Sequence, residues 1–232
     1  MSKFLKSTVC IIGSGPAGTF ASEILVKNGI DVLMIEEGNL KKNCESEKFL
    51  DNTLVGPNIT YDYGFSKQIG GSSNLWSGRL APLELKDFNL ENKGKKYWPI
   101  TYEEILKYYK FASQKLDINF ENIWNEKNNL NNNIPNIFKH KKFNNFDFKK
   151  FFWRYPSFNC MDYLKNNHLK FSNFKLISNT KVLRLFQNSQ DGRIKYLEGV
   201  TNEKVHIKIE SEFFVIANGG IEAPRLLLNS NS

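Results

Sequence analysis

The stretch Thr8-Val9-Cys10-Ile11-Ile12-Gly13-Ser14-Gly15-Pro16-Ala17-Gly18 decides the fold of this 232-residue chain. Its apolar first half predicts a β-strand at 8–12, and the pattern G-x-G-x-x-G at 13–18 predicts a tight turn that opens a helix. A second strand is predicted at 32–35, and it ends on the acids Glu36 and Glu37. A strand, a glycine turn, a helix, a second strand and a terminal acid are typical of a unit that binds an adenine dinucleotide.

The residues of this unit have separate physical roles. Gly13 permits the tight turn, Gly15 lets backbone N–H groups approach a pyrophosphate, and Gly18 lets the helix pack closely on the sheet. The helix N-terminus adds unpaired donors and the positive end of a dipole, which favour bound phosphate. Glu36 is placed to accept hydrogen bonds from ribose hydroxyls.

The segment between the two strands has the spacing of an amphipathic helix. We expect one apolar face, made of Ala17, Phe20, Ala21, Ile24 and Leu25. Gly29 is expected to end this helix as its C′ residue.

Composition favours a globular protein and restricts its class. The formal net charge is +8, from 32 Lys and Arg against 24 Asp and Glu. Lysine pairs at 41–42, 95–96, 141–142 and 149–150 are dispersed, which favours a solvated surface over a nucleic-acid-binding face and leaves attraction of anionic substrates open.

The cysteines and the hydropathy of the chain indicate the cellular compartment in which the protein is expected. Cys10, Cys44 and Cys160 form no metal-ligand spacing and no C-x-x-C pair, so we expect no metal site, a buried Cys10 and a reducing compartment. The first strand begins too early for a signal peptide, and no apolar run is long enough to span a bilayer. We therefore expect a cytoplasmic protein with no membrane span.

The middle of the chain contains three further features. Adjacent glycines and serines at 70–73 predict a loop whose backbone and side-chain donors lie close to a ligand. The alternative interpretation is an ordinary surface loop. Thr101 and Glu104 predict a capping box at the start of a structural helix. The asparagine-rich stretch 121–150 predicts an irregular insertion.

Regular structure is expected to return after Asp162. Strands at 182–186, 194–197 and 205–209, with a turn at 191–192, predict an antiparallel meander. An apolar strand at 213–217 leads to the residues Asn218-Gly219-Gly220 and a helix with Pro224 in its first turn. Because this helix has little room before the end of the sequence, we expect the chain to be a truncated part of a larger fold.

These features together resemble the glucose-methanol-choline (GMC) family of FAD-dependent oxidoreductases, in particular its bacterial sugar- and polyol-oxidising branch and its pyranose-oxidase-like relatives. Four stretches carry the resemblance: 13–18 with 36–38, 70–79, 97–104 and 217–227. The second and fourth are the more specific. The resemblance implies an α/β, Rossmann-like FAD-binding domain with an antiparallel meander and part of an inserted substrate domain.

The resemblance also implies the cofactor and its ligands. Residues expected to hold or adjoin FAD are Gly13, Ser14, Gly15, Pro16, Ala17, Gly18, Glu36, Glu37, Gly71, Ser72, Ser73, Val182, Ala217 and Gly219. Some relatives attach FAD covalently through a histidine directly before a tryptophan. Here Leu75 precedes Trp76, which implies noncovalent FAD.

Family members transfer a hydride from an alcohol carbon to flavin N5 while a histidine takes the hydroxyl proton. The resemblance thus implies oxidation of the CH–OH group of a small-molecule alcohol, a sugar or polyol. The family's catalytic histidine is expected beyond residue 232, so we assign no catalytic residue. We expect His140, His168 and His206 to be structural or surface residues.

The predicted domains are a first FAD-binding segment at 1–90, an inserted partial substrate domain or cap at 91–170 and a second FAD-binding segment at 171–232. One alternative is another FAD- or NAD-dependent oxidoreductase on the same fold. A lone Cys44 disfavours a disulfide reductase, and the Y-x-x-x-K match at 63–67 falls among turn formers, which disfavours a short-chain dehydrogenase. Another alternative is a non-catalytic, truncated dinucleotide-binding fragment.

Overall fold

The computed structural model describes residues 3–40, 66–89, 91–92, 95–96, 98–118 and 152–230. It divides into two compact units, the first made of Met1–Trp76 and Asn159–Ser232 and the second of Ser77–Phe158. The boundaries 1–90, 91–170 and 171–232 remain a prediction for functional domains. The asparagine-rich stretch, Cys44, His140 and Tyr63 lie outside the described residues.

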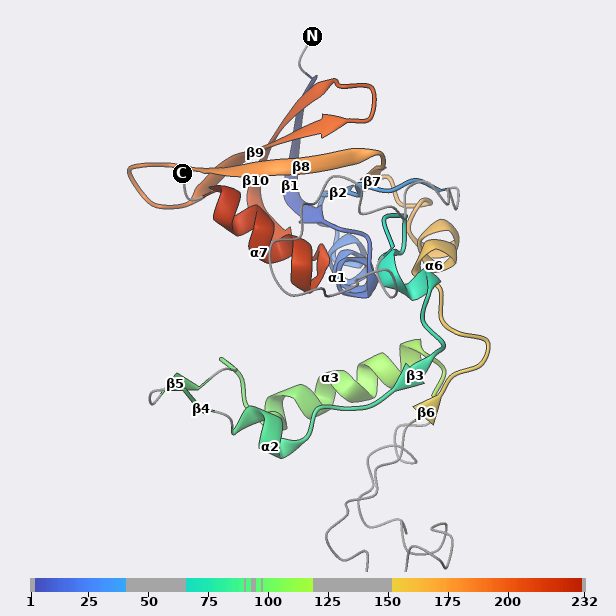
Figure 1. Cartoon of the computed structure of the whole chain (residues 1–232). Helices are drawn as coiled ribbons and strands as arrows, with labels where there is room; N and C mark the ends of the chain where they lie inside the picture. The colour runs from blue at the N-terminus through green and yellow to red at the C-terminus, as the bar shows by residue number, and fades with distance from the viewer. Residues whose placement is uncertain are drawn as a thin grey trace, which may run out of the picture. The chain divides into compact units, whose positions relative to one another are not determined.

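The first unit is built on a six-stranded sheet with the strand order β7-β2-β1-β10-β9-β8 (Figure 1). Strands β1 (Lys3–Ile12), β2 (Val32–Ile35) and β7 (Phe174–Ile177) run parallel, and β10 (His206–Ile216) runs parallel to β1 on its other side. β9 (Ile194–Thr201) pairs antiparallel with both β10 and β8 (Thr180–Gln187). This arrangement confirms the predicted α/β fold with its antiparallel meander.

The predicted separation of strands at 205–209 and 213–217 was wrong, because β10 is a single strand. Its pairing with β1 keeps one register from Lys3 opposite Ile207 to Ile12 opposite Ile216. The polar residues in the middle of β10 do not break the strand, because β1 has polar residues opposite them. The hydroxyls of Ser7 and Ser211 lie 2.8 Å apart.

Helix α1 (Pro16–Lys27) follows the glycine turn as predicted, and Gly29 lies just beyond it with a φ of +79°. The predicted apolar face was right only in part, since Ala21 and Leu25 pack against the core but are only partly buried. The buried residues of α1 are Gly18, Thr19, Ser22, Glu23 and Val26. Ile24, by contrast, is 48% exposed.

Partners on helix α6 (Cys160–Asn167) explain why polar residues of α1 are buried. The Tyr163 hydroxyl donates to the Glu23 carboxylate at 3.0 Å, and His168 Nε2 lies 3.1 Å from the Thr19 carbonyl oxygen. The two helices contact each other (Figure 1). Burial with a hydrogen bond costs a polar group little, so this interface does not need an apolar stripe.

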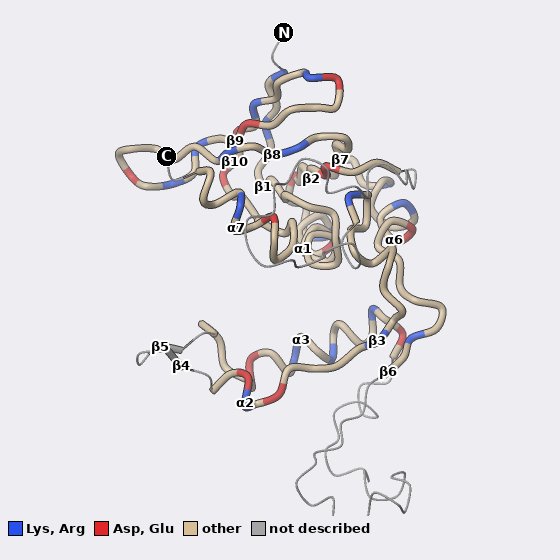
Figure 2. The backbone as a smooth tube through the Cα atoms, in the orientation of Figure 1, with Lys and Arg blue, Asp and Glu red and all other residues tan. Residues whose placement is uncertain are grey.

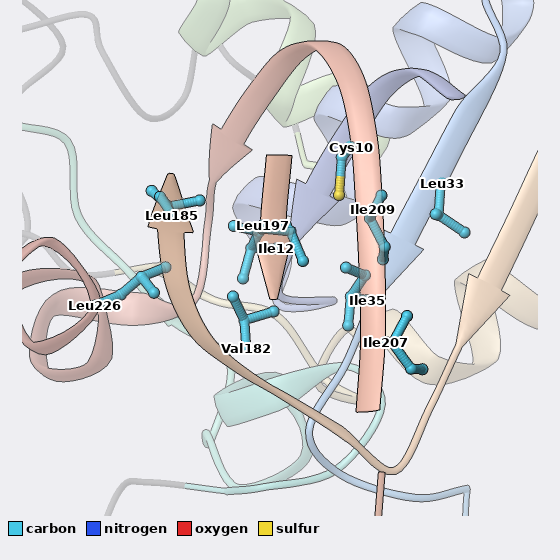
Figure 3. Packing of buried hydrophobic residues seen from close by; sticks show 10 residues of the cluster. All are labelled: Cys10, Ile12, Leu33, Ile35, Val182, Leu185, Leu197, Ile207, Ile209 and Leu226. Carbon is cyan, nitrogen blue, oxygen red and sulfur yellow. The ribbon is translucent and has the colours of Figure 1, made fainter. Parts of the chain in front are cut away.

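The alternation of β1 places apolar side chains on both faces of the sheet. Val9 and Ile11 belong to a core cluster with Val26 of α1 and Leu164 of α6. Figure 3 shows the other core cluster, whose members come from β1, β2, the meander and the last helix, α7 (Gly219–Ser230): Cys10, Ile12, Leu33, Ile35, Val182, Leu185, Leu197, Ile207, Ile209 and Leu226. Cys10 is fully buried as predicted, and burial raises its pKa to about 12, so its thiol stays protonated.

Helix α7 (Gly219–Ser230) starts at the glycine pair, so the prediction that Pro224 lies in the first turn was wrong. The last turn of α7 is joined to the meander, because the Leu185 N–H donates to Ser230 Oγ at 2.9 Å. α7 thereby extends from the end of β10 to β8. Leu226, fully buried, packs this helix into the core.

In the second unit, helix α3 (Tyr102–Lys115) has the predicted capping box. The Glu104 N–H donates to Thr101 Oγ1 at 3.2 Å, and the Thr101 N–H donates to the Glu104 carboxylate at 2.7 Å. The other elements are β3 (Arg79–Leu80) paired with β6 (Phe152–Trp153), α2 (Leu85–Phe88), and β4 (Glu91–Asn92) paired with β5 (Lys95–Lys96).

Figure 2 shows Lys and Arg on several elements of the described chain, not gathered on one of them. Across the described residues, no helix combines the length and the apolar character that a membrane span requires.

Candidate cofactor-binding site

The turn between β1 and α1 depends on two glycines that no other residue can replace without strain. Gly13 has a φ of +102°, and a Cβ on it would lie 2.6 Å from the Ala217 carbonyl oxygen. A Cβ on Gly18 would lie 2.0 Å from the Gly13 carbonyl oxygen. These contacts fold the turn tightly and bring the start of α1 against the sheet.

Gly15 differs from these two glycines, because its missing side chain leaves open space. It is the N-cap of α1, with a φ of −65°, and a Cβ on it would meet nothing within 4 Å. No side chain caps the helix, and its first turn has no acidic residue. The intrahelical hydrogen bonds begin with the one from Thr19 N to the Gly15 carbonyl oxygen. The N–H groups of Ala17 and Gly18 come before Thr19 in the first turn, where helical N–H groups lack an intrahelical acceptor, so they are suited to bind a phosphate.

Glu36 lies at the end of β2, and its buried carboxylate holds the turn in place. Oε2 accepts from the Ser14 N–H at 2.9 Å and from Ser14 Oγ at 2.6 Å, and Oε1 accepts from the Gly38 N–H at 2.9 Å. Burial raises the pKa of Glu36, and the hydrogen bonds from Ser14 and Gly38 partly oppose this shift. A carboxylate has about four acceptor positions, so one on Oε1 is left for a ribose hydroxyl.

Glu37 is the second acid at this end of β2, and it is compensated by lysines. Its Oε1 lies 3.0 Å from Lys67 Nζ and 3.7 Å from Lys181 Nζ. Lys67 arrives from the segment before the glycine–serine loop, and Lys181 lies on β8. The acid is therefore held beside Glu36 without leaving an unbalanced negative charge.

The glycine–serine loop forms a short 3₁₀ helix, η1 (Gly71–Asn74), against the turn. A Cβ on Gly71 would lie 3.2 Å from Gly15 Cα, and the Gly70 N–H donates to Ser14 Oγ at 3.0 Å. Ser73 Oγ donates to the Gly70 carbonyl at 2.7 Å and accepts from the Cys160 N–H at 2.9 Å. Ser14 therefore connects this loop to Glu36.

The end of β10 supplies the last part of the site. The Ala217 N–H donates to the Ile12 carbonyl at 2.8 Å, which carries the pairing of β1 and β10 as far as the glycine turn. Gly219 has a φ of +84°, and a Cβ on either Gly219 or Gly220 would meet nothing within 4 Å. This second strand–glycine–helix junction therefore lies beside the first.

A cavity of about 580 Å³ lies among these elements. Most of the predicted cofactor-binding residues line it: Gly13, Gly15, Pro16, Ala17, Glu36, Glu37, Gly71, Ser72, Val182, Ala217 and Gly219. Ser14, Gly18 and Ser73 are buried behind this lining and support it. The volume is within the range of about 300–1,000 Å³ usual for ligand sites.

Sequence reasoning missed several lining residues, including Ser66, Lys67, Thr180, Asn218, Glu222 and Arg225. Glu222 is buried, and Arg225 Nε donates to its Oε2 at 2.5 Å. The spacing of Glu222 and Arg225 along α7 was the signal that could have found two of these residues. Polar side chains at i and i+3 lie on one helix face, and this face borders the cavity.

This donor and acceptor set fits an adenine dinucleotide. The uncapped N-terminus of α1 suits the pyrophosphate, the remaining acceptor position of Glu36 suits a ribose, and the open glycines leave room for close backbone approach. Neither His168 nor His206 lines the cavity: His168 is buried between α1 and α6, and His206 is exposed on β10. These two positions agree with their predicted structural and surface roles.

Comparisons with known proteins agree with this geometry. Residues 6–43 match the family model described as an FAD binding domain, which confirms the prediction of an FAD-binding unit at the start of the chain. Solved structures of similar fold include a formate oxidase variant from Aspergillus oryzae (TM-score 0.64, 17% identity, 99% of this chain and 48% of that one). The chain has the fold of the GMC-type flavin oxidases.

Two other solved structures share this fold. Pyridoxine 4-oxidase from Mesorbium loti has a TM-score of 0.63 and 17% identity, over 97% of this chain and 52% of that one. A fungal aryl-alcohol oxidase has a TM-score of 0.62 and 13% identity, over 97% of this chain and 47% of that one. The chain thus corresponds to about half the length of each.

Two curated relatives are similar over 124 residues. They are 6'''-hydroxyparomomycin C oxidase of Streptomyces lividus and paromamine 6'-oxidase of Streptomyces fradiae, each 30% identical over 47% of this chain. The matched part spans 23% of the length of each relative.

Proposed function

We propose that this chain is the FAD-binding portion of an oxidoreductase that acts on the CH–OH group of a small alcohol, a sugar or a polyol. The observation that supports the proposal most strongly is the convergence of the uncapped α1 N-terminus, Glu36 and the second glycine turn on one cavity. We propose noncovalent FAD, because Leu75 stands where a covalent attachment would need a histidine. We also propose a cytoplasmic location.

The residues of the site have distinct proposed roles. The N–H groups of Ala17 and Gly18 bind the pyrophosphate, and Glu36 orients the adenosine ribose. Gly71 and Ser72 lie beside the pyrophosphate and flavin, and the Val182 backbone contacts the adenine. Bound FAD supplies the acceptor for the hydride that leaves the alcohol carbon, while a base takes the hydroxyl proton.

The similar proteins support an alcohol as the electron donor. They include proteins named as an aryl-alcohol oxidase and as an oxidase of a hydroxylated compound, 6'''-hydroxyparomomycin C. We assign neither of these substrates to the present protein. For the present protein we propose only the general chemistry, oxidation at a carbon that bears a hydroxyl group.

Anaerobic reduction tests this proposal. The full-length protein, of which this chain is proposed to be the FAD-binding portion, is loaded with FAD, oxygen is removed, and a panel of sugars, polyols and amines is added while flavin absorbance is followed. We expect bleaching by one or more sugars or polyols and none by amines. Bleaching by amines alone would contradict the proposed substrate class, and FAD binding without bleaching by any alcohol would favour a non-catalytic binding fragment.

A further inference from the structure

Asn218 is the one polar residue of the turn Ala217-Asn218-Gly219-Gly220, and it lines the cavity. Its side-chain amide oxygen, Oδ1, is buried and has no hydrogen-bond partner within the part of the chain that the structure describes. Buried polar atoms in native proteins are paired in roughly nine cases out of ten, so an unpaired one calls for an explanation. The orphaned acceptor costs folding free energy that the apoprotein does not recover.

The backbone of Asn218 lies directly against the phosphate-binding turn. A Cβ on Gly13 would come within 2.8 Å of Asn218 Cα, and the preceding residue Ala217 donates its N–H to the Ile12 carbonyl. On its other side, Gly219 and Gly220 present no side chains to the cavity. Within this turn, Asn218 is therefore the residue that offers a polar side chain to a ligand.

The cationic donors that line the cavity are engaged elsewhere. Arg225 Nε donates to Glu222, and Lys67 Nζ pairs with Glu37. Other half-buried amides of this unit have partners. Asn173 Nδ2, for example, donates to the carbonyls of Val26 at 3.0 Å and Ile30 at 2.9 Å. Among the cavity-lining residues that the structure describes, Asn218 is the one with a buried side-chain atom that lacks a partner.

We propose that Asn218 is a further cofactor ligand, whose amide oxygen turns toward the cavity and accepts a hydrogen bond from a hydroxyl or N–H group of bound FAD. A pyrophosphate offers no donor at neutral pH, so the partner belongs to a sugar, the ribityl chain or a ring of the dinucleotide. This inference rests on the proposed function, because it needs FAD in the cavity. It adds a cofactor-contacting residue that is not part of the glycine turn at 13–18 or of the acid Glu36.

The proposal predicts that one substitution, Asn218→Leu, weakens FAD binding without destabilising the apoprotein. Asn218→Leu keeps a similar side-chain size and removes the buried acceptor, so we expect the apoprotein to unfold at the same or a higher temperature. We expect the same variant to bind FAD about tenfold more weakly, as measured by equilibrium dialysis. Asn218→Ala provides the FAD measurement if the leucine does not fit.

Asn173→Leu is the matched control, because its amide has partners and lies outside the cavity lining. It should lower the apoprotein unfolding temperature and leave FAD affinity unchanged. Wild-type FAD affinity in both Asn218 variants would overturn the assignment of Asn218. Absence of FAD binding by the folded wild type would instead overturn the proposed function.

Discussion

Gly15 and Gly18 belong to the same glycine pattern, yet the structure predicts opposite consequences for their substitution. A Cβ on Gly15 enters open space at the cavity, and the backbone there suits an ordinary N-cap residue. A Cβ on Gly18 lies 2.0 Å from the Gly13 carbonyl oxygen. Gly15→Ser and Gly18→Ala therefore separate ligand binding from folding.

The magnitudes follow from these two environments. A serine at the N-cap and the lower backbone entropy of the unfolded chain should stabilise the Gly15→Ser apoprotein by about 0.5–1 kcal/mol. The Gly18→Ala clash is with backbone and requires a shift of more than an ångström, so we expect a loss of about 3 kcal/mol. At about 2–4 °C per kcal/mol, the unfolding temperature rises by about 1–4 °C in the first variant and falls by about 6–12 °C in the second.

FAD binding should show a different order. The Gly15→Ser side chain occupies the approach to the pyrophosphate and its hydroxyl competes for the donors of α1, so affinity should fall at least about tenfold. Thermal unfolding of the apoproteins and FAD dialysis at a temperature where all are folded measure both quantities. The reasoning fails if Gly15→Ser binds FAD like the wild type, or if Gly18→Ala unfolds at the wild-type temperature.

Three further substitutions test other parts of the structure. Burial raises the pKa of Glu36 above its ordinary value of 4.5, so its contribution to stability is complete below about pH 4.5 and is lost as the pH rises through the folded-state pKa. In urea unfolding across pH, the wild type should lose stability relative to Glu36→Gln as the pH increases, and a constant difference would contradict the raised pKa. Thr101→Ala removes the hydrogen bond from the Glu104 N–H to the capping side chain, and it should destabilise α3 by about 1 kcal/mol without altering FAD affinity. If amide hydrogen exchange in α3 is no faster in this variant than in the wild type, the capping box does not stabilise the helix. Arg225→Met leaves the buried Glu222 carboxylate without its ion pair and should cost about 2 kcal/mol at neutral pH, whereas equal unfolding midpoints would show that the pair does not stabilise α7.

The local chemistry of both units could be predicted from the sequence where it depends on short-range patterns. The glycine turn, the strand at Val32–Ile35 and the capping box at Thr101 each follow from the allowed backbone conformations or hydrogen bonds of a few adjacent residues. The meander was predictable for the same reason, since alternating residues and a glycine turn at Gly192 mark its hairpin.

The parts that were missed depend on partners distant in the sequence. Burial of Thr19 and Glu23 on α1 requires His168 and Tyr163 of α6. Continuity of β10 through its polar middle requires β1 beside it. Of the cavity lining, Lys67 was missed because its position depends on a salt bridge to Glu37 that no local pattern reveals.

Equilibrium dialysis of the folded protein against FAD, with and without excess ADP, tests the central claim most directly. The site built from Gly13–Gly18, Glu36 and the β10–α7 turn predicts one FAD bound per chain, and ADP should displace it because both share the adenosine and pyrophosphate that these residues contact. A folded protein that binds no FAD, or that binds FAD without competition from ADP, would contradict the account.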